Sequence, residues 1–176
     1  VDELHGRGLS VVVRIVAFQD PVAGRAIPSI AAYNTATGGP LTRSGQVFLD
    51  PTDVGAREYA LQLAAEVCAA GADEVQFDYV RFPDGSKVGV RFDGGSGTSE
   101  TVRTEAIRSF LAEARALVPD DCRVAADVFG FTTSIPGDGG IGQQIEVLAG
   151  EADVLSPMVY PNHWGRGWFG FSVPAN

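Results

Sequence analysis

Four stretches of the chain have the hydrophobic pattern of β-strands. Residues 9–18 form a near-continuous apolar run rich in β-branched side chains, which is typical of a strand covered on both faces. Shorter strand patterns follow at residues 74–80, 123–128 and 153–160. We therefore predict four strands, well separated along the chain.

Helical patterns occupy the intervals between these strands. Asp50 and Pro51 introduce a helix whose buried stripe is predicted to be Tyr59, Leu63 and Val67. A second helix begins at Ser99, and its apolar face consists of Val102, Ala106, Ile107, Phe110, Ala114 and Leu117. A short third helix is marked by Ile141, Ile145 and Leu148. Alternating strands and helices predict an α/β fold of right-handed parallel units.

The loops of this pattern are unequal in length. The links from helix to strand are short, whereas the links from strand to helix at residues 19–45, 81–98 and 129–140 are long. All the long loops therefore gather at the carboxyl ends of the strands. That edge is the ligand-binding face of both barrel and doubly wound folds.

Two of the predicted strands end in a carboxylate at this edge, Asp78 and Asp127. Side chains alternate between the two faces of a strand, so one face can be assigned throughout the sheet. The assignment directs these side chains into the lumen of a barrel: Arg14, Gln76, Asp78, Asp127 and Tyr160. A lone buried charge is very costly, so we expect Arg14 to pair with Asp78.

The two carboxylates suggest cleavage of a glycosidic bond, which requires one ionised and one protonated carboxyl group. Arg14 would keep Asp78 ionised as nucleophile or base, and Phe129 and Phe131 would favour protonated Asp127 as general acid. The alternative for either residue is a structural role, as a helix cap or an ion-pair partner of a nearby arginine.

Further side chains near the strand ends are candidates for binding a sugar. The set is Arg14, Gln76, Tyr79, Arg81, Tyr160, His163 and Trp164. Flat aromatic faces suit the C–H-rich surface of a sugar ring. Arg81 would hold Asp78 or a substrate oxygen, and the alternative is a solvated side chain. For the aromatic residues the alternative is packing in the loops, and for His163 it is a position on the surface.

The composition narrows the possible partners. The chain has 176 residues and a formal net charge of −9. This charge disfavours binding to nucleic acid or to an anionic membrane, whereas it is compatible with binding a neutral sugar. The apolar runs are too short for membrane insertion. No phosphate-binding loop or metal-ligand spacing is present, so we expect no cofactor and no metal; a scattered metal site of Asp78, Asp127 and His163 is an alternative.

The two cysteines, Cys68 and Cys122, each precede a predicted strand. We expect two small buried hydrophobic side chains there, and a single bridge is the alternative if the protein is exported.

Several segments together resemble a known family. They are RIVAFQDP at residues 14–21, LDP at 49–51, EVQFDYVRFP at 74–83, VAADVFG at 124–130, GIGQQIE at 140–146 and DVLSPMVYPNHW at 153–164. In this order they resemble a family of glycoside hydrolase domains, long catalogued as a domain of unknown function, in the TIM-barrel glycosidase superfamily. The resemblance covers nearly the whole chain.

The resemblance implies a (β/α)8 TIM barrel and a bacterial, extracellular or cell-envelope protein that acts on carbohydrate. It implies that Asp78 closes strand four as nucleophile or base and that Asp127 closes strand five, where relatives often have Glu as the acid. A barrel of this kind needs about 250 residues. We therefore expect residues 1–176 to be one partial barrel, roughly strands three to six, truncated at both ends of a longer protein.

The function expected from the sequence is hydrolysis of an extracellular or cell-wall polysaccharide by two Asp carboxylates. The alternatives are a barrel that binds carbohydrate without cleaving it and a metal-dependent hydrolase. The sequence predicts neither the sugar nor the oligomeric state.

Overall fold

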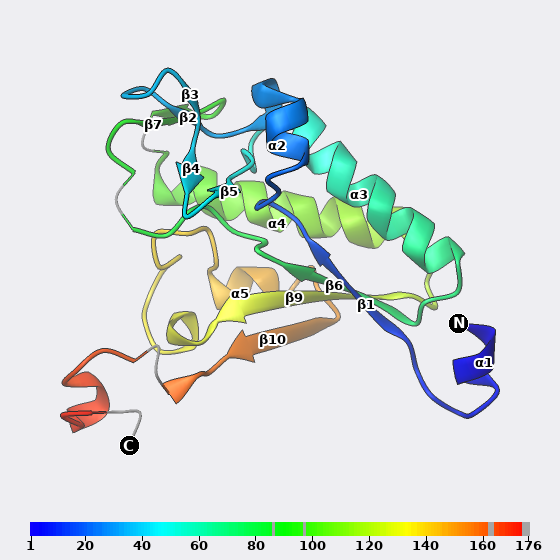
Figure 1. Cartoon of the computed structure of the whole chain (residues 1–176). Coiled ribbons are helices and arrows are strands. Elements are labelled where there is room, and N and C mark those ends of the chain that lie inside the picture. The colour runs from blue at the N-terminus through cyan, green and yellow to red at the C-terminus, as the bar shows by residue number, and fades with distance from the viewer. Residues whose placement is uncertain (86, 97, 162–163, 174–176) are drawn as a thin grey trace.

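A four-stranded parallel sheet organises the structure, a computed structural model that describes residues 1–85, 87–96, 98–161 and 164–173 (Figure 1). Its strand order is β1-β6-β9-β10. The strands are β1 (Val12–Val16), β6 (Glu74–Asp78), β9 (Arg123–Phe129) and β10 (Val154–Met158). These are the four strands predicted from the sequence, with shorter bounds for the first, second and fourth and one more residue in the third.

Two long helices, α3 (Val54–Ala69) and α4 (Glu100–Leu117), cover one face of this sheet (Figure 1). Asp53 caps α3 by accepting a hydrogen bond from the Ala56 backbone N–H, and Ser99 caps α4 through Val102 N–H. The Phe110 ring packs edge-on against Phe18 and Phe77, at 5.0 Å between centroids in each case.

The buried stripe of α3 differs from the prediction. The buried residues are Ala56, Ala60, Leu61, Ala64 and Cys68. Tyr59 is exposed and donates a hydrogen bond to Asp20 Oδ2 at 3.1 Å, and Leu63 and Val67 are only partly buried. Small alanines allow α3 to pack closely on the sheet, so the larger side chains lie beside the contact.

The long loop after β1 contains several short elements instead of irregular chain. They are α2 (Ala23–Ala26), η1 (Pro28–Ile30), β2 (Tyr33–Asn34), β3 (Gly39–Pro40), β4 (Thr42–Arg43) and β5 (Gln46–Val47). From the loop after β6 come β7 (Val90–Phe92) and β8 (Gly95–Ser96), which complete a second sheet of order β3-β2-β7-β8. The two long loops thus pair with each other above the carboxyl end of the parallel sheet.

The remaining described elements are single turns. They are α1 (Asp2–His5), η2 (Gly130–Thr133), α5 (Ile145–Leu148) and η4 (Trp168–Gly170). Among the described residues, no helix combines the length and the apolar character that crossing a membrane would require.

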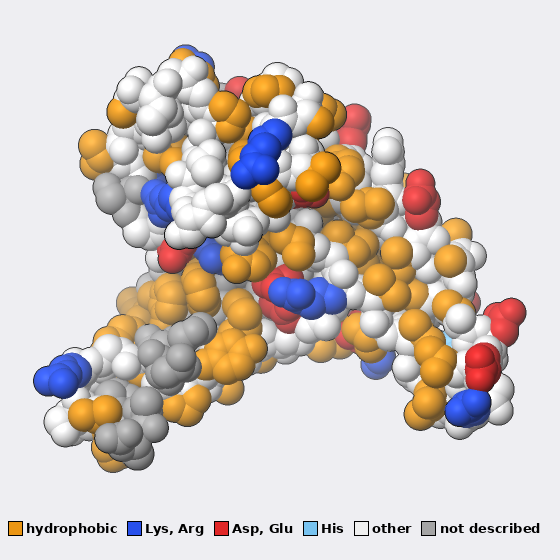
Figure 2. Space-filling view, viewed as in Figure 1, with side chains coloured by type: hydrophobic (Ala, Val, Ile, Leu, Met, Phe, Trp, Pro, Cys, Tyr) orange, Lys and Arg blue, Asp and Glu red, His pale blue; other side chains and the backbone are white. Residues whose placement is uncertain are grey.

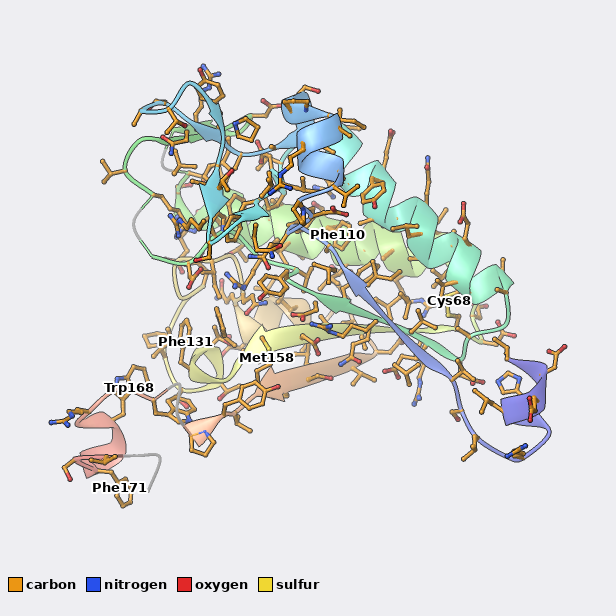
Figure 3. The ribbon with its side chains drawn as sticks, viewed as in Figure 1. Cys68, Phe110, Phe131, Met158, Trp168 and Phe171 are labelled. Carbon is orange, nitrogen blue, oxygen red and sulfur yellow. A yellow bond between two sulfur atoms is a disulfide. The ribbon has the colours of Figure 1, made fainter. Side chains whose placement is uncertain are left out.

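A disulfide joins Cys68 to Cys122, with an S–S distance of 2.04 Å and a Cα–Cα distance of 5.8 Å. The expectation of two separate buried thiols is therefore wrong, and the alternative of one bridge is correct. The cause is topological: α3 ends and β9 begins at the same edge of the sheet. Figure 3 places Cys68 at the end of the fold remote from Phe131 and Met158.

Candidate active site

The strand register brings the polar residues of the sheet to one face. Arg14 pairs with Gln76 between β1 and β6, and Phe77 pairs with Ala126 between β6 and β9. The next residues, Asp78 and Asp127, are therefore level with each other on neighbouring strands. Phe77 packs on helix α4, so Gln76 and Asp78 point away from the helices, as the alternation of side chains predicts.

Both carboxylates are well buried and share a positively charged neighbour. Asp78 is 5% exposed and Asp127 is 7% exposed. The Arg14 guanidinium donates a hydrogen bond to Asp78 Oδ2, which is the expected ion pair, and Arg14 Nε lies 3.9 Å from Asp127 Oδ2. Tyr79 N–H donates to Asp78 Oδ1 at 2.7 Å. Arg14 thus contacts one carboxylate and lies within ion-pair distance of the other.

Asp127 is held from β6 by the side chain of Gln76. Gln76 Nε2 donates to Asp127 Oδ1 at 2.6 Å and lies 3.4 Å from Ser156 Oγ of strand β10. The polar contacts on this face therefore run across all four strands, from Arg14 to Ser156.

Burial raises the pKa of the Asp127 carboxyl above its ordinary value, and the charge of Asp78 raises it further. The hydrogen bond from Gln76 and the charge of Arg14 act in the opposite direction. The sequence had suggested Phe129 and Phe131 as the cause of such a rise. Those rings stack on each other, with centroids 5.4 Å apart, and line a neighbouring pocket.

The carboxylates open into a cavity of about 460 Å³. Its polar lining includes Arg14, Gln76, Asp78, Asp127, Ser156 and Tyr160. A larger pocket of about 1040 Å³ shares Arg14, Asp78 and Tyr160 and extends to Asp20, Arg43 and Asp84 of the loops. Figure 2 shows this face hollowed at its middle, where acidic and basic side chains gather.

Strand β6 ends in a strained turn directly after Asp78. Tyr79 has φ of 51°, in the left-handed region that residues other than glycine seldom adopt. Strain of this kind is often found at functional sites, where the surrounding structure holds it in place.

Arg81 stabilises this turn from a buried position. Its guanidinium lies 5.0 Å from the ring centroid of Tyr79 and 4.4 Å from that of Phe129. Nη1 donates to the Phe82 carbonyl at 3.1 Å and lies 3.4 Å from Asp84 Oδ1. Arg81 is therefore not solvated, and its acidic partner is Asp84 instead of Asp78. Burial lowers the pKa of Arg81.

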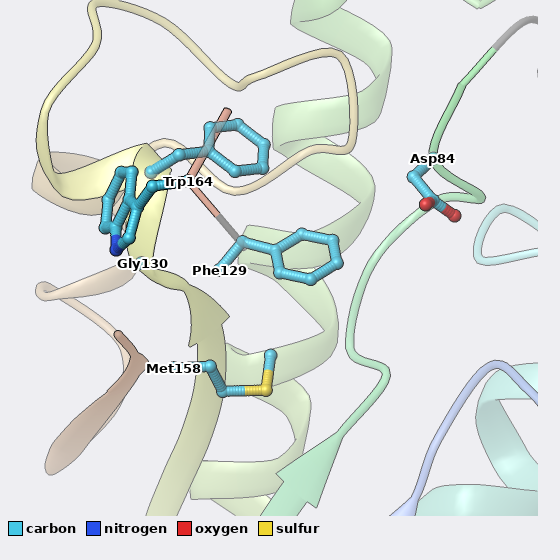
Figure 4. A pocket seen from close by; sticks show the side chains of 6 residues that line it. Asp84, Phe129, Gly130, Met158 and Trp164 are labelled. Carbon is cyan, nitrogen blue, oxygen red and sulfur yellow. The ribbon is translucent and has the colours of Figure 1, made fainter. Parts of the chain in front are cut away.

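An apolar pocket of about 330 Å³ lies beside the carboxylates (Figure 4). Its lining is Phe129, Gly130, Phe131, Met158 and Trp164, with Asp84 on the opposite side. Trp164 thus lies near the carboxylates but in this apolar pocket. Tyr160 is half exposed and lines the cavity of the carboxylates themselves. A Cβ at Gly130 would lie 2.6 Å from the Met158 carbonyl, so only glycine fits here.

His163 falls outside the described residues, so its predicted role stays a prediction. Within the described part of the chain, no group of three or more His, Cys, Asp or Glu side chains is arranged to hold a metal ion.

The sequence reasoning missed several residues of the site. Ser156 could have been found, because the register of β10 against β9 pairs it with Asp127. Met158 lies two residues before Tyr160, so the alternation of side chains could have indicated it too, whereas Asp84 lines the pockets without any distinctive local pattern. Gln143 is fully buried beside Asp127 but lies in a loop, where strand periodicity gives no signal.

Comparison with protein families gives one match along the whole chain. The model of the family described as "Putative glycosyl hydrolase domain" matches residues 1–176. The chain belongs to this family. A comparison with curated proteins gave no match.

Solved structures resemble the domain in fold. A hypothetical protein from Ruminiclostridium thermocellum ATCC 27405 is 33% identical, with a TM-score of 0.60, over 72% of this chain and 63% of that one. The glycoside hydrolase domain of PelA from Pseudomonas aeruginosa is 14% identical, with a TM-score of 0.58, over 89% and 53%. An alpha-galactosidase from Thermus thermophilus, in complex with stachyose, is 17% identical, with a TM-score of 0.58, over 88% and 29%.

The chain thus spans less than two thirds of the length of each of these three proteins. Its parallel sheet and helices form part of a TIM barrel. The assignment of the four strands to positions three to six of a complete barrel stays a prediction.

Proposed function

We propose that this domain hydrolyses a glycosidic bond in an extracellular or cell-wall polysaccharide, with Asp78 as nucleophile or base and Asp127 as general acid. The observation that carries the proposal is the level placement of the two carboxyl groups on neighbouring strands, facing one cavity. Glycosidases use such a pair to attack the anomeric carbon and to protonate the departing oxygen.

The surroundings of the two residues support this division of roles. Asp78 accepts hydrogen bonds from the Arg14 guanidinium and from Tyr79 N–H, both of which stabilise the carboxylate form. Asp127 has a raised pKa because of burial and the nearby charge of Asp78. In the first step Asp127 would pass its proton to the leaving oxygen, while Asp78 attacks directly or removes a proton from water.

The walls of the site suit a carbohydrate. Tyr79 and Tyr160 stand beside the carboxylates, and Trp164 and Phe129 offer apolar rings in the adjoining pocket. Gln76, Arg14 and Arg81 supply polar groups around the cavity, and we retain His163 as a candidate for binding the substrate. Among structures of similar fold, the Thermus thermophilus enzyme holds stachyose and Ega3 of Aspergillus fumigatus holds galactosamine.

The disulfide supports an extracellular or envelope location, because such bonds persist in oxidising compartments. The net charge of −9 gives no attraction for nucleic acid.

The test is hydrolysis of a polysaccharide panel by the wild-type protein and by Asp78→Asn and Asp127→Asn. We expect each variant to lose about 10²–10⁴-fold in kcat, the range typical of acid–base groups. The Asp127→Asn loss should be much smaller with an activated aryl glycoside, whose leaving group needs no protonation. Asp120→Asn, a change at a fully exposed carboxylate, is the matched control.

If Asp127→Asn behaves like Asp120→Asn on every substrate, the assigned pair is wrong. A wild-type protein that binds a polysaccharide without cleaving it would instead favour the carbohydrate-binding barrel.

A further inference from the structure

The hydrogen bonds of strand β9 are interrupted at the site. Arg123 N–H donates to the Asp73 carbonyl on the β6 side, whereas the Val124 carbonyl accepts from Asp153 N–H on the β10 side. Backbone groups alternate in direction along a strand, so those of Asp127 and Phe129 also face β6. The partners of the Asp127 carbonyl and of the Phe129 N–H should come from the β6 residue opposite position 128, which by register is Tyr79.

Tyr79 does not supply those hydrogen bonds. Its φ of 51° turns its peptide away from β9. Tyr79 N–H donates to Asp78 Oδ1 at 2.7 Å, and its carbonyl accepts from Phe18 N–H at 3.2 Å, on the β1 side. The hydrogen bonding between β6 and β9 therefore stops directly after Asp78, the last residue of β6.

Gln143 fills the vacated position. Its side chain is 0% exposed. Nε2 donates to the Asp127 carbonyl at 3.0 Å, and Oε1 accepts from Phe129 N–H at 2.9 Å. A residue of a neighbouring parallel strand would make the same two bonds through its N–H and its C=O, one to each residue flanking position 128. Nε2 also reaches the Val80 carbonyl at 3.3 Å, beyond the turn.

The loop around Gln143 is firmly anchored. Asp138 accepts hydrogen bonds from Gly140 N–H and Gly142 N–H, at 2.9 Å each, and from Arg103 of helix α4. A Cβ at Gly142 would lie 2.8 Å from the Arg103 carbonyl, so the loop runs directly against that helix. The amide of Gln143 is thus presented to β9 from a rigid support.

We propose that Gln143 is a positioning residue for the carboxylate pair. Its amide takes the place of the Tyr79 N–H and C=O in the sheet, so that the chain can turn directly after Asp78 while β9 keeps Asp127 level with Asp78. The inference rests on the proposed function, and it adds a residue that contacts neither the cavity nor a substrate.

The test replaces Gln143 by Met, which keeps the volume and removes all three hydrogen bonds. We expect kcat to fall about 100-fold with KM little changed, because an error of about 1 Å in the placement of reacting groups has an effect of this size. Gln144→Ala, a change at the adjacent and partly exposed residue, should leave kcat unaltered.

Leu148→Ala controls for stability. Leu148 is fully buried in α5, in the segment that follows Gln143, so its truncation should lower the melting temperature without moving β9 against β6. If Gln143→Met and Leu148→Ala reduce kcat equally at equal loss of melting temperature, Gln143 has only a structural role and the inference is overturned. Wild-type kcat in Gln143→Met overturns it as well.

A second readout does not depend on activity. The Asp127 carboxyl can be titrated by carbon-13 NMR in the wild-type and variant proteins; Asp78 and Arg14 are the charged groups that face it. We expect its pKa in Gln143→Met to fall toward 3.8, because a looser site admits water. An unchanged titration contradicts the inference.

The two readouts separate the possible failures. A wild-type protein that cleaves no glycoside refutes the proposed function, and the NMR titration then decides the role of Gln143 alone. If Gln143→Met does not fold, Gln143→Glu replaces it in both experiments. The Glu side chain keeps the volume and the oxygen that accepts from Phe129 N–H, but it places a second oxygen against the Asp127 carbonyl.

Discussion

Ionisation of Asp127 lowers the stability of the folded state, because its carboxyl group is buried beside the charge of Asp78. Burial and the charge of Asp78 raise its pKa above the ordinary value of 3.8. At pH below 3.8 the carboxyl is protonated in both folded and unfolded chains, so it imposes no penalty. As the pH rises through the folded pKa, the unfolded chain releases its proton more readily, and the folded state loses stability.

We therefore predict that Asp127→Asn is more stable than the wild type at neutral pH. The amide keeps the oxygen that accepts from Gln76 but carries no charge. The difference in the free energy of unfolding should grow as the pH rises from 3.8 and then level off, as measured by urea denaturation across pH. A difference independent of pH would contradict the prediction, and Asp120→Asn should show none.

For single residues, the sequence predicted which polar side chains share a face of the sheet better than it predicted the contacts that hold them in place. The alternation of strand side chains was enough to put Arg14, Gln76 and Asp78 on one face, and the cost of a buried charge was enough to pair Arg14 with Asp78. Gln143 was beyond such reasoning, because its partner Val80 is 63 positions away and a loop has no period. The catalytic roles of Asp78 and Asp127 stay proposals.

Among the elements, the loop between β9 and α5 depends on one buried ion pair. Asp138 is 3% exposed and accepts from Arg103 Nε at 2.6 Å and from Nη2 at 3.0 Å. The Arg103 side chain is itself largely buried on helix α4. Loss of one partner leaves the other charge buried and uncompensated.

We predict that Asp138→Ala lowers the free energy of unfolding by about 3–5 kcal/mol, the usual effect of breaking a buried pair. Combining it with Arg103→Met should restore part of this loss, because the lone charge is removed. Thermal and urea denaturation of the two variants provide the measurement. A double variant that is no more stable than Asp138→Ala would argue against the electrostatic explanation.

The elements themselves were predicted unevenly. The strands of the parallel sheet and the two long helices have strong periodic patterns, and all of these were found. The buried stripe of α3 was misassigned because large apolar side chains suggested it, whereas the helix packs through Ala56, Ala60 and Ala64. The second sheet went unseen because its strands are two or three residues long and because β2 pairs with β7 across almost sixty positions, as in Tyr33 with Arg91.

For the whole molecule, the Cys68–Cys122 disulfide joins α3 to β9 over a separation of 54 residues. A link of this kind restricts the unfolded chain and typically contributes about 2–4 kcal/mol. We predict that Cys68→Ala with Cys122→Ala lowers the urea midpoint accordingly, while kcat at 25 °C is retained because the bond lies at the opposite edge of the sheet. A variant of unchanged stability would show that the bond contributes nothing.

The overall architecture was accessible because the loop lengths and the family resemblance both indicate a barrel-type sheet. The disulfide was only an alternative in the sequence analysis, since the distance between two cysteines depends on how distant segments meet. That residues 1–176 are one barrel segment of a longer protein stays a prediction.

Arg14, the cation closest to the carboxylates, belongs to β1, the outermost strand of the parallel sheet. A slip of that strand by a single residue would carry Arg14 to the helical side and leave two acids facing each other with no counter-ion. The pairing of β1 with β6 thus decides whether the two carboxylates keep their counter-ion, so a molecule with this one strand misaligned would lack the proposed activity although the rest of its sheet is unchanged.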